Sequence, residues 1–179
     1  MNSVANFFRK FSDYSDKVIG IIAMIFLGAM VYAIALQVVA RYVFDSPPPW
    51  TEEAARYAMV WVGLLGATVS FKAEFDPVLA KVPASLPRPL LMMVGIIRWL
   101  SLLLFLLPIL WYSFFGPGAN FTRGFLSRNW YLEAETFEIS TFFVAIGVPI
   151  FIIFILLHAV AQGLTPPPPK SEIEIDDAI

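Results

Sequence analysis

One stretch of the chain limits its fold more than any other. Val18 to Ala40 is a run of 23 residues without a charged side chain. As a helix, rising about 1.5 Å per residue, such a run is long enough to cross a hydrocarbon core of roughly 30 Å. Three further apolar runs cover residues 54–71, 90–115 and 139–157, with short polar clusters between them. The pattern predicts four membrane-spanning helices.

The composition agrees with a membrane protein. Of 179 residues, 59% are hydrophobic and 15% are charged, and the mean hydropathy is +0.74. A soluble domain carries about 25% charged residues, so this chain has too little polar surface to cover a water-soluble globule. We therefore predict an all-α integral membrane protein, a four-helix transmembrane bundle with its membrane domain at residues 18–164.

The two ends of the chain differ from this membrane domain. In residues 1–17 the apolar side chains recur every three or four positions, which predicts an amphipathic helix lying in the membrane interface; they are Val4, Phe7, Phe8, Phe11 and Tyr14. The alternative is a solvated leader continuous with the first span. Residues 165–179 combine four successive prolines with acidic residues, which predicts a disordered tail.

Most of the polar chemistry lies between the first two runs, from Arg41 to Arg56, a segment that we call the elbow. Its three prolines at 47–49 cannot continue a helix. Thr51 then provides an N-cap for the next helix, and acidic residues follow in the first turn, where the helix dipole favours negative charge. Glu52 and Arg56 are four residues apart, in the order that favours an ion pair.

Two isolated polar residues fall in or beside the later spans. Arg98 lies about two turns inside the third run, where a charge costs at least ~2.5 kcal/mol unless it snorkels, meets water or pairs with an acid. For a pair, Glu74 or Asp76 ranks above the elbow acids, since their loop lies at the same end of the span. His158, the one histidine, is predicted to be an interfacial side chain and not a metal ligand, because metal sites need several converging ligands.

Several classes of protein are disfavoured by what the chain lacks. It has no cysteine, phosphate-binding loop, HExxH motif or recognisable nucleophile motif, and no basic stripe for nucleic acid. We predict no catalytic, cofactor or metal site, and no enzyme activity. Four simple spans without repeats also make a poor transport pathway, so the pattern favours an accessory or scaffold subunit.

The distribution of basic residues predicts the orientation. With the amino terminus inside, seven lysines and arginines lie in the inner segments and four in the outer ones. The excess of inner positive charge favours both termini in the cytoplasm. The elbow and the 116–138 loop then face outward.

The elbow and its flanks also resemble a known family. The residues that carry the likeness run from Gln37 to Trp61, with QVVARYVF, then Ser46, then WTEE at 50–53, Arg56, and Val60-Trp61 before Gly63 and Gly66. This segment resembles the small membrane subunit, the Q-type or DctQ-like component, of tripartite ATP-independent periplasmic (TRAP) transporters. The four-span layout extends the likeness over nearly the whole chain.

The resemblance implies an inner-membrane subunit with two partners, a large M-type permease subunit and a periplasmic substrate-binding protein. It implies that the large subunit binds substrate and sodium during uptake of small organic acids, while this chain contacts membrane lipids and braces its partner. The residues expected at the elbow and the partner interface are Arg41, Trp50, Glu52, Glu53, Arg56 and Trp61. We expect Glu52 and Glu53 to act through Arg41 or Arg56. The alternative function is a self-contained four-span protein such as a small homo-oligomeric channel.

Overall fold

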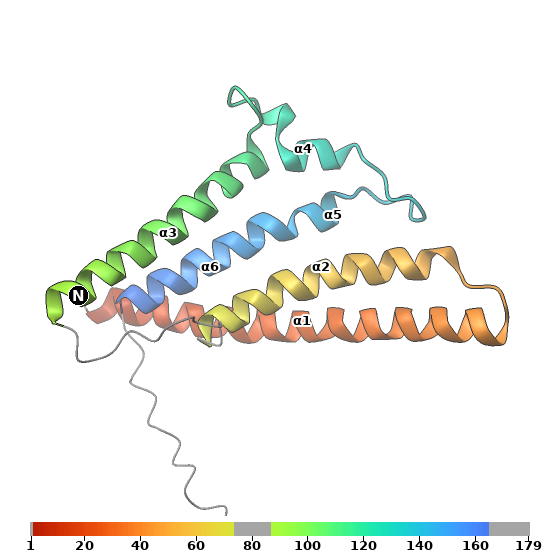
Figure 1. Ribbon diagram of the computed structural model, residues 1–179, viewed down its shortest axis with the longest axis horizontal. Helices are drawn as coiled ribbons and strands as arrows, with labels where there is room; N and C mark the ends of the chain where they lie inside the picture. The colour runs from red at the N-terminus through yellow and green to blue at the C-terminus, as the bar shows by residue number, and fades with distance from the viewer. Residues whose placement is uncertain (1, 74–86, 165–179) are drawn as a thin grey trace, which may run out of the picture.

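The protein, seen in a computed structural model, is described for residues 2–73 and 87–164 (Figure 1). Its elements are α1 (Asn2–Val43), α2 (Pro49–Lys72), α3 (Arg88–Phe114), the 3-10 helix η1 (Phe121–Arg123), α4 (Phe125–Trp130), α5 (Phe142–Ala145) and α6 (Gly147–Leu164). The described residues form no strand, and two isolated bridges occur in loops. The all-α prediction is confirmed.

Four helical stretches are long and apolar enough to cross a membrane, at Asn6–Val43, Pro49–Lys72, Pro89–Phe114 and Phe142–Gly163, the last of which combines α5 and α6. They confirm the four predicted spans. The fourth begins three residues later than predicted and ends six residues later, because the helix continues through the polar His158 and Gln162. Successive spans alternate in direction, so α1 begins near the places where α2 and α6 end (Figure 1). We call this the termini end, and the opposite end of α1 and α2 the elbow end.

The amino-terminal segment is helical, as predicted, but it is not a separate element. α1 continues without a break for 42 residues, roughly 63 Å at the usual helical rise. Ser12, Ser15 and Ile19 are buried, so the segment packs into the bundle. The continuity with the first span matches the alternative, whereas these buried side chains do not fit a solvated leader. That the segment lies in the membrane interface stays a prediction.

α1 and α2 form a long antiparallel pair (Figure 1). On α1 the inward positions recur every seven residues, at Ser12, Ile19, Phe26, Ala33 and Ala40, of which Phe26 is half-buried and the others buried. A seven-residue repeat keeps one face of a helix against its neighbour when the two helices coil around each other. The small residues in this repeat let the two backbones approach closely.

The same repeat continues on α2. Thr51, Ala58 and Leu65 are buried at intervals of seven residues, and the next position in the series is Lys72, the last residue of the helix. The repeat therefore brings a charged side chain to the inward face at the termini end.

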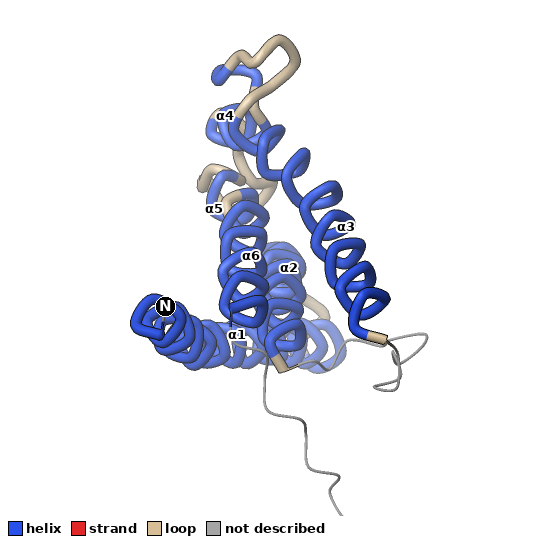
Figure 2. Tube along the Cα trace, turned by 90° about the vertical axis from the view of Figure 1, so that its left-hand side faces the viewer, coloured by secondary structure: helices blue, strands red, loops and turns tan. Residues whose placement is uncertain are grey.

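α6 packs on this pair and carries α3 on its other side. Leu106 of α3 and Ile152 and Ile155 of α6 form a buried apolar cluster, with Phe71 of α2 against it. α3 itself diverges from the other spans (Figure 2). Only 6% of its span is buried within the chain, against 39% for α6. Most of the α3 surface is therefore free for lipid or for a partner.

The connection between α3 and α4 depends on two glycines. A side chain on Gly124 would lie 2.1 Å from the carbonyl oxygen of Phe114, and one on Gly116 would lie 2.4 Å from that of Arg123. Only glycine permits such backbone contacts. They fold η1 and α4 against the end of α3.

Candidate functional site

The elbow begins with a sharp end to α1. Asp45 adopts a left-handed conformation with φ of 50°, which Asp tolerates better than most residues. The Ser46 amide then donates to the Ala40 carbonyl at 3.1 Å. Thr51 is not the N-cap of α2: the helix begins at Pro49, and the Thr51 hydroxyl donates to the Pro48 carbonyl at 2.7 Å. Proline suits the first turn because it lacks the amide that would go unpaired there.

Glu53 is the central residue of the elbow. It is 2% exposed, and its carboxylate accepts three hydrogen bonds. One oxygen accepts from the Tyr57 hydroxyl at 2.7 Å and from the Glu135 amide at 2.9 Å, and the other accepts from the Thr136 amide at 2.7 Å. We call these four residues the elbow junction. Hydrogen bonds to an ionised acceptor are short and roughly twice as strong as neutral ones, so Glu53 fixes a distant loop to α2.

The loop that donates these amides is itself closed by hydrogen bonds. The Ala134 amide donates to the Ile139 carbonyl at 3.0 Å, and the Thr141 amide donates to the Leu132 carbonyl at 2.8 Å. Two successive backbone amides at the tip of such a turn form a small concave site for an anion. Here the anion is the side chain of Glu53.

The predicted partners of the elbow acids are wrong. Arg56 lies 3.6 Å from Glu135 of the loop, not in a pair with Glu52. Both side chains of this pair are largely exposed, at 54% and 86%, so the pair contributes little stability. Within the described ranges, neither Glu52 nor Arg41 forms an ion pair.

The other predicted residues occupy separate places. The Trp50 ring lies 6.5 Å from that of Phe137, which adds an apolar contact between elbow and loop. Trp61 stacks on Phe26 at 5.3 Å, between α2 and α1, and thus belongs to the helix packing. Arg98 is exposed on α3 and forms no ion pair with any described residue. The predicted acids Glu74 and Asp76 lie outside the described residues.

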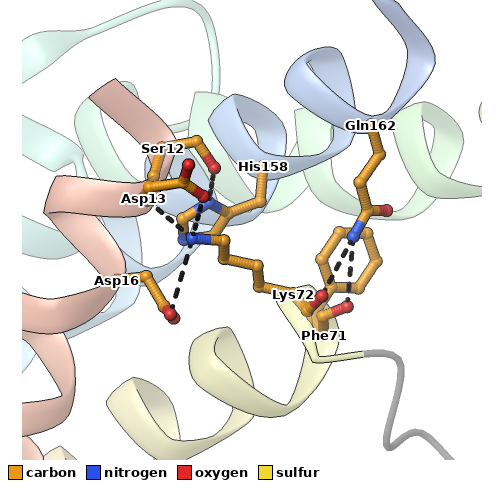
Figure 3. A network of polar contacts seen from close by, with 7 residues as sticks. All are labelled: Ser12, Asp13, Asp16, Phe71, Lys72, His158 and Gln162. Carbon is orange, nitrogen blue, oxygen red and sulfur yellow. Dashed lines mark hydrogen bonds and ion pairs between the residues drawn. The ribbon is translucent and has the colours of Figure 1, made fainter. Parts of the chain in front are cut away.

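A second polar cluster, which the sequence prediction missed, lies at the termini end (Figure 3). His158 of α6 is fully buried, and its Nδ1 lies 2.7 Å from the Ser12 hydroxyl of α1. The prediction that His158 is an interfacial side chain is therefore wrong. Its position on α6 faces α1, and the long α1 helix covers it.

Lys72 completes this cluster from the end of α2. Its ammonium lies 2.8 Å from Asp13 and 3.5 Å from Asp16, and it donates to the Ser12 carbonyl at 3.2 Å. We call Ser12, Asp13, Asp16, Lys72 and His158 the termini junction. It joins α1, α2 and α6, and the seven-residue repeats that place Ser12 and Lys72 inward were the signal for it.

The Ser12 and His158 side chains of the termini junction are enclosed by the bundle. A serine beside a histidine can be a nucleophile and its base, but Ser12 and His158 are 3% and 0% exposed, so no substrate reaches them. No group of three or more His, Cys, Asp or Glu residues in the described part of the chain could hold a metal ion. The polar side chains instead hold helices and loops together.

These features define a multi-pass helical membrane protein with a polar junction at each end. Residues 30–165 match the family described as tripartite ATP-independent periplasmic transporters, DctQ component. The chain belongs to this family, and the resemblance seen in the elbow is confirmed. The chain is similar to a Haemophilus influenzae protein that is named as a TRAP transporter small permease protein. The two are 35% identical over 63 residues. That alignment covers 35% of this chain and 39% of the relative's length.

Proposed function

We propose that this chain braces the large M-type permease subunit of a TRAP transporter and helps to dock the periplasmic substrate-binding protein. The transporter takes up small organic acids by coupling to an ion gradient, and the large subunit binds the substrate and sodium. The chain lies in the inner membrane with both termini in the cytoplasm and the elbow end toward the periplasm. Family membership and the excess of basic residues in the segments predicted to lie inside support this arrangement.

The elbow junction is the observation that carries the docking role. Glu53 joins two connections that are 82 residues apart, so the elbow and the 132–141 loop form one surface and not two independent loops. Preorganised loops lose less conformational entropy when they bind a partner. Exposed polar side chains from both segments contribute to this surface, among them Glu52, Arg56 and Glu135.

The bracing role rests on α3. This helix has little contact with its own chain and exposes Arg98 ten residues after its start, roughly 15 Å along the helix. An arginine facing hydrocarbon is costly. A carboxylate or a polar group of the large subunit relieves that cost, so we place the large subunit against the α3 face that carries Arg98.

A photo-crosslinking side chain at position 50 tests the docking role. Trp50 is 38% exposed at the elbow, and we expect illumination of the assembled transporter to link this position to the binding protein. Phe105, which is 69% exposed in the middle of α3, provides the control position and is expected to give no such product. Adducts from position 50 that contain lipid or the large subunit, but never the binding protein, would contradict the docking role.

A further inference from the structure

The first turns of α1 present three different surfaces. One surface, with Ser12, Ser15 and Ile19, is buried against the bundle. The side of the helix next to it exposes a row of aromatic side chains at helical spacing, Phe7 at 66% and Tyr14 at 71%, with Phe11 between them at 49%. The rings of Phe7 and Phe11 stack at 6.3 Å. These exposed rings form an apolar strip along the helix.

Two lysines, Lys10 and Lys17, border this strip, whereas Arg9 lies on the far side of the helix. All three basic side chains are exposed, and none of them forms an ion pair with a described residue. Lys10 and Lys17 are seven residues apart and therefore lie on the same side of the helix, two turns from each other. Lys10 and Lys17, together with the aromatic strip, form what we call the leader face: Phe7, Lys10, Phe11, Tyr14 and Lys17.

The acids of the same turns do not cancel this charge. Asp13 and Asp16 both contact the Lys72 ammonium in the termini junction. The described charges around residues 6–19 are four positive ones, three on α1 and that of Lys72, and two negative ones, those of Asp13 and Asp16. Their net charge is +2. The leader face therefore presents positive charge beside exposed aromatic rings.

We propose that the leader face binds the headgroups of anionic phospholipids at the membrane surface. Aromatic rings bordered by lysine or arginine partition to the boundary between headgroups and acyl chains, and clustered basic residues there attract anionic lipids. The first uncharged run begins at Val18, directly after Lys17, so the face lies at the entrance of a membrane span. The contacts of the termini junction fix the rotation of α1 about its own axis, so that the leader face points away from the bundle and toward the lipid. This proposal does not rest on the proposed transport function.

The chain has no cysteine, so a single cysteine can carry a fluorescent label without background. We would label Tyr14→Cys in the full chain and reconstitute it in nanodiscs of phosphatidylcholine with a minor fraction of phosphatidylglycerol. Quenching by headgroup-labelled phosphatidylglycerol is compared with quenching by equally labelled phosphatidylcholine. Tyr131→Cys, at an exposed tyrosine far along the chain from the leader face, provides the matched control site.

At position 14 we expect phosphatidylglycerol to quench several-fold more than phosphatidylcholine. Lys10→Gln with Lys17→Gln should remove most of this preference, because each lysine near the surface attracts anionic lipid. Both lysines are exposed, so the fold should persist, and an unchanged helical spectrum checks this. Equal quenching by the two lipids, or free access of a water-soluble quencher, would overturn the proposal. Shielding of the label from lipid and water alike in the assembled transporter would assign the face to a protein partner and also overturn it.

Discussion

Glu53→Gln is expected to release the 132–141 loop from α2 and to abolish most uptake by the assembled transporter. The carboxylate offers two oxygens to three donors, whereas glutamine offers one oxygen and an NH₂ group that is itself a donor. At least one loop amide then faces another donor, and the remaining hydrogen bonds lose their ionised acceptor. The loop should open on the order of tenfold more often, since a weakened contact raises the population of locally open states.

Limited digestion with a glutamate-specific protease measures this opening. The loop contains three cleavage sites, Glu133, Glu135 and Glu138, and the cleavage rate tracks the open population when opening is fast. Glu52→Gln makes the same chemical change at the exposed neighbouring residue, so it should leave cleavage of the loop near the unmodified level. Equal cleavage of the two variants would show that Glu53 does not hold the loop.

Lys72→Met is expected to destabilise the termini end by about 1–3 kcal/mol. Removal of one member of a buried ion pair costs about 3–5 kcal/mol, and the cost is lower here because the carboxylates of Asp13 and Asp16 are 53% and 28% exposed. Without the ammonium, the two acids on α1 repel each other beside the buried His158. The start of α1 should then separate from α2 and α6.

Thermal unfolding of the purified chain in detergent measures this loss, with hydrogen exchange of residues 6–19 as the local readout. Lys72→Arg keeps the charge and should recover much of the stability, while Arg128→Gln removes an exposed charge outside both junctions and should have little effect. If Lys72→Met unfolds at the same temperature as the unmodified chain and residues 6–19 stay protected, the junction does not fasten α1.

The spans were predictable because a bilayer demands about 20 apolar residues from every crossing helix. The run from Val18 to Ala40 satisfies this requirement without any information from the rest of the chain. The elbow was predictable as a turn because three prolines cannot continue α1. The exact start of α2 was not predictable: the helix begins at Pro49, before the Thr51 that was predicted to cap it.

The partners of Glu53 could not be predicted, because they are backbone amides 82 and 83 residues away. Backbone groups carry no residue signature, so the pattern of opposite charges predicted Arg41 and Arg56 as partners instead. The helical pattern did contain one hint. Glu53 shares its side of α2 with Tyr57, one turn on, whereas Glu52 shares its side with Arg56.

His158 illustrates a second limit. Its position at the end of an apolar run predicted an interfacial side chain. The side chain is buried because α1 extends far enough toward the amino terminus to cover it. The seven-residue repeat through Ser12, Ile19 and Phe26 already indicated that the packed face of α1 extends into the first seventeen residues. The prediction treated residues 1–17 as an element separate from the first span, and it therefore missed that the packed face is continuous.

Purification of the tagged chain from its native membrane in mild detergent, with mass spectrometry of the proteins that accompany it, tests the central claim most directly. We predict that one larger polytopic permease accompanies the chain, and that Arg98→Leu lowers its recovery. Recovery of the chain alone, as a discrete homo-oligomer that conducts ions after reconstitution, would contradict the accessory-subunit account and support a small channel.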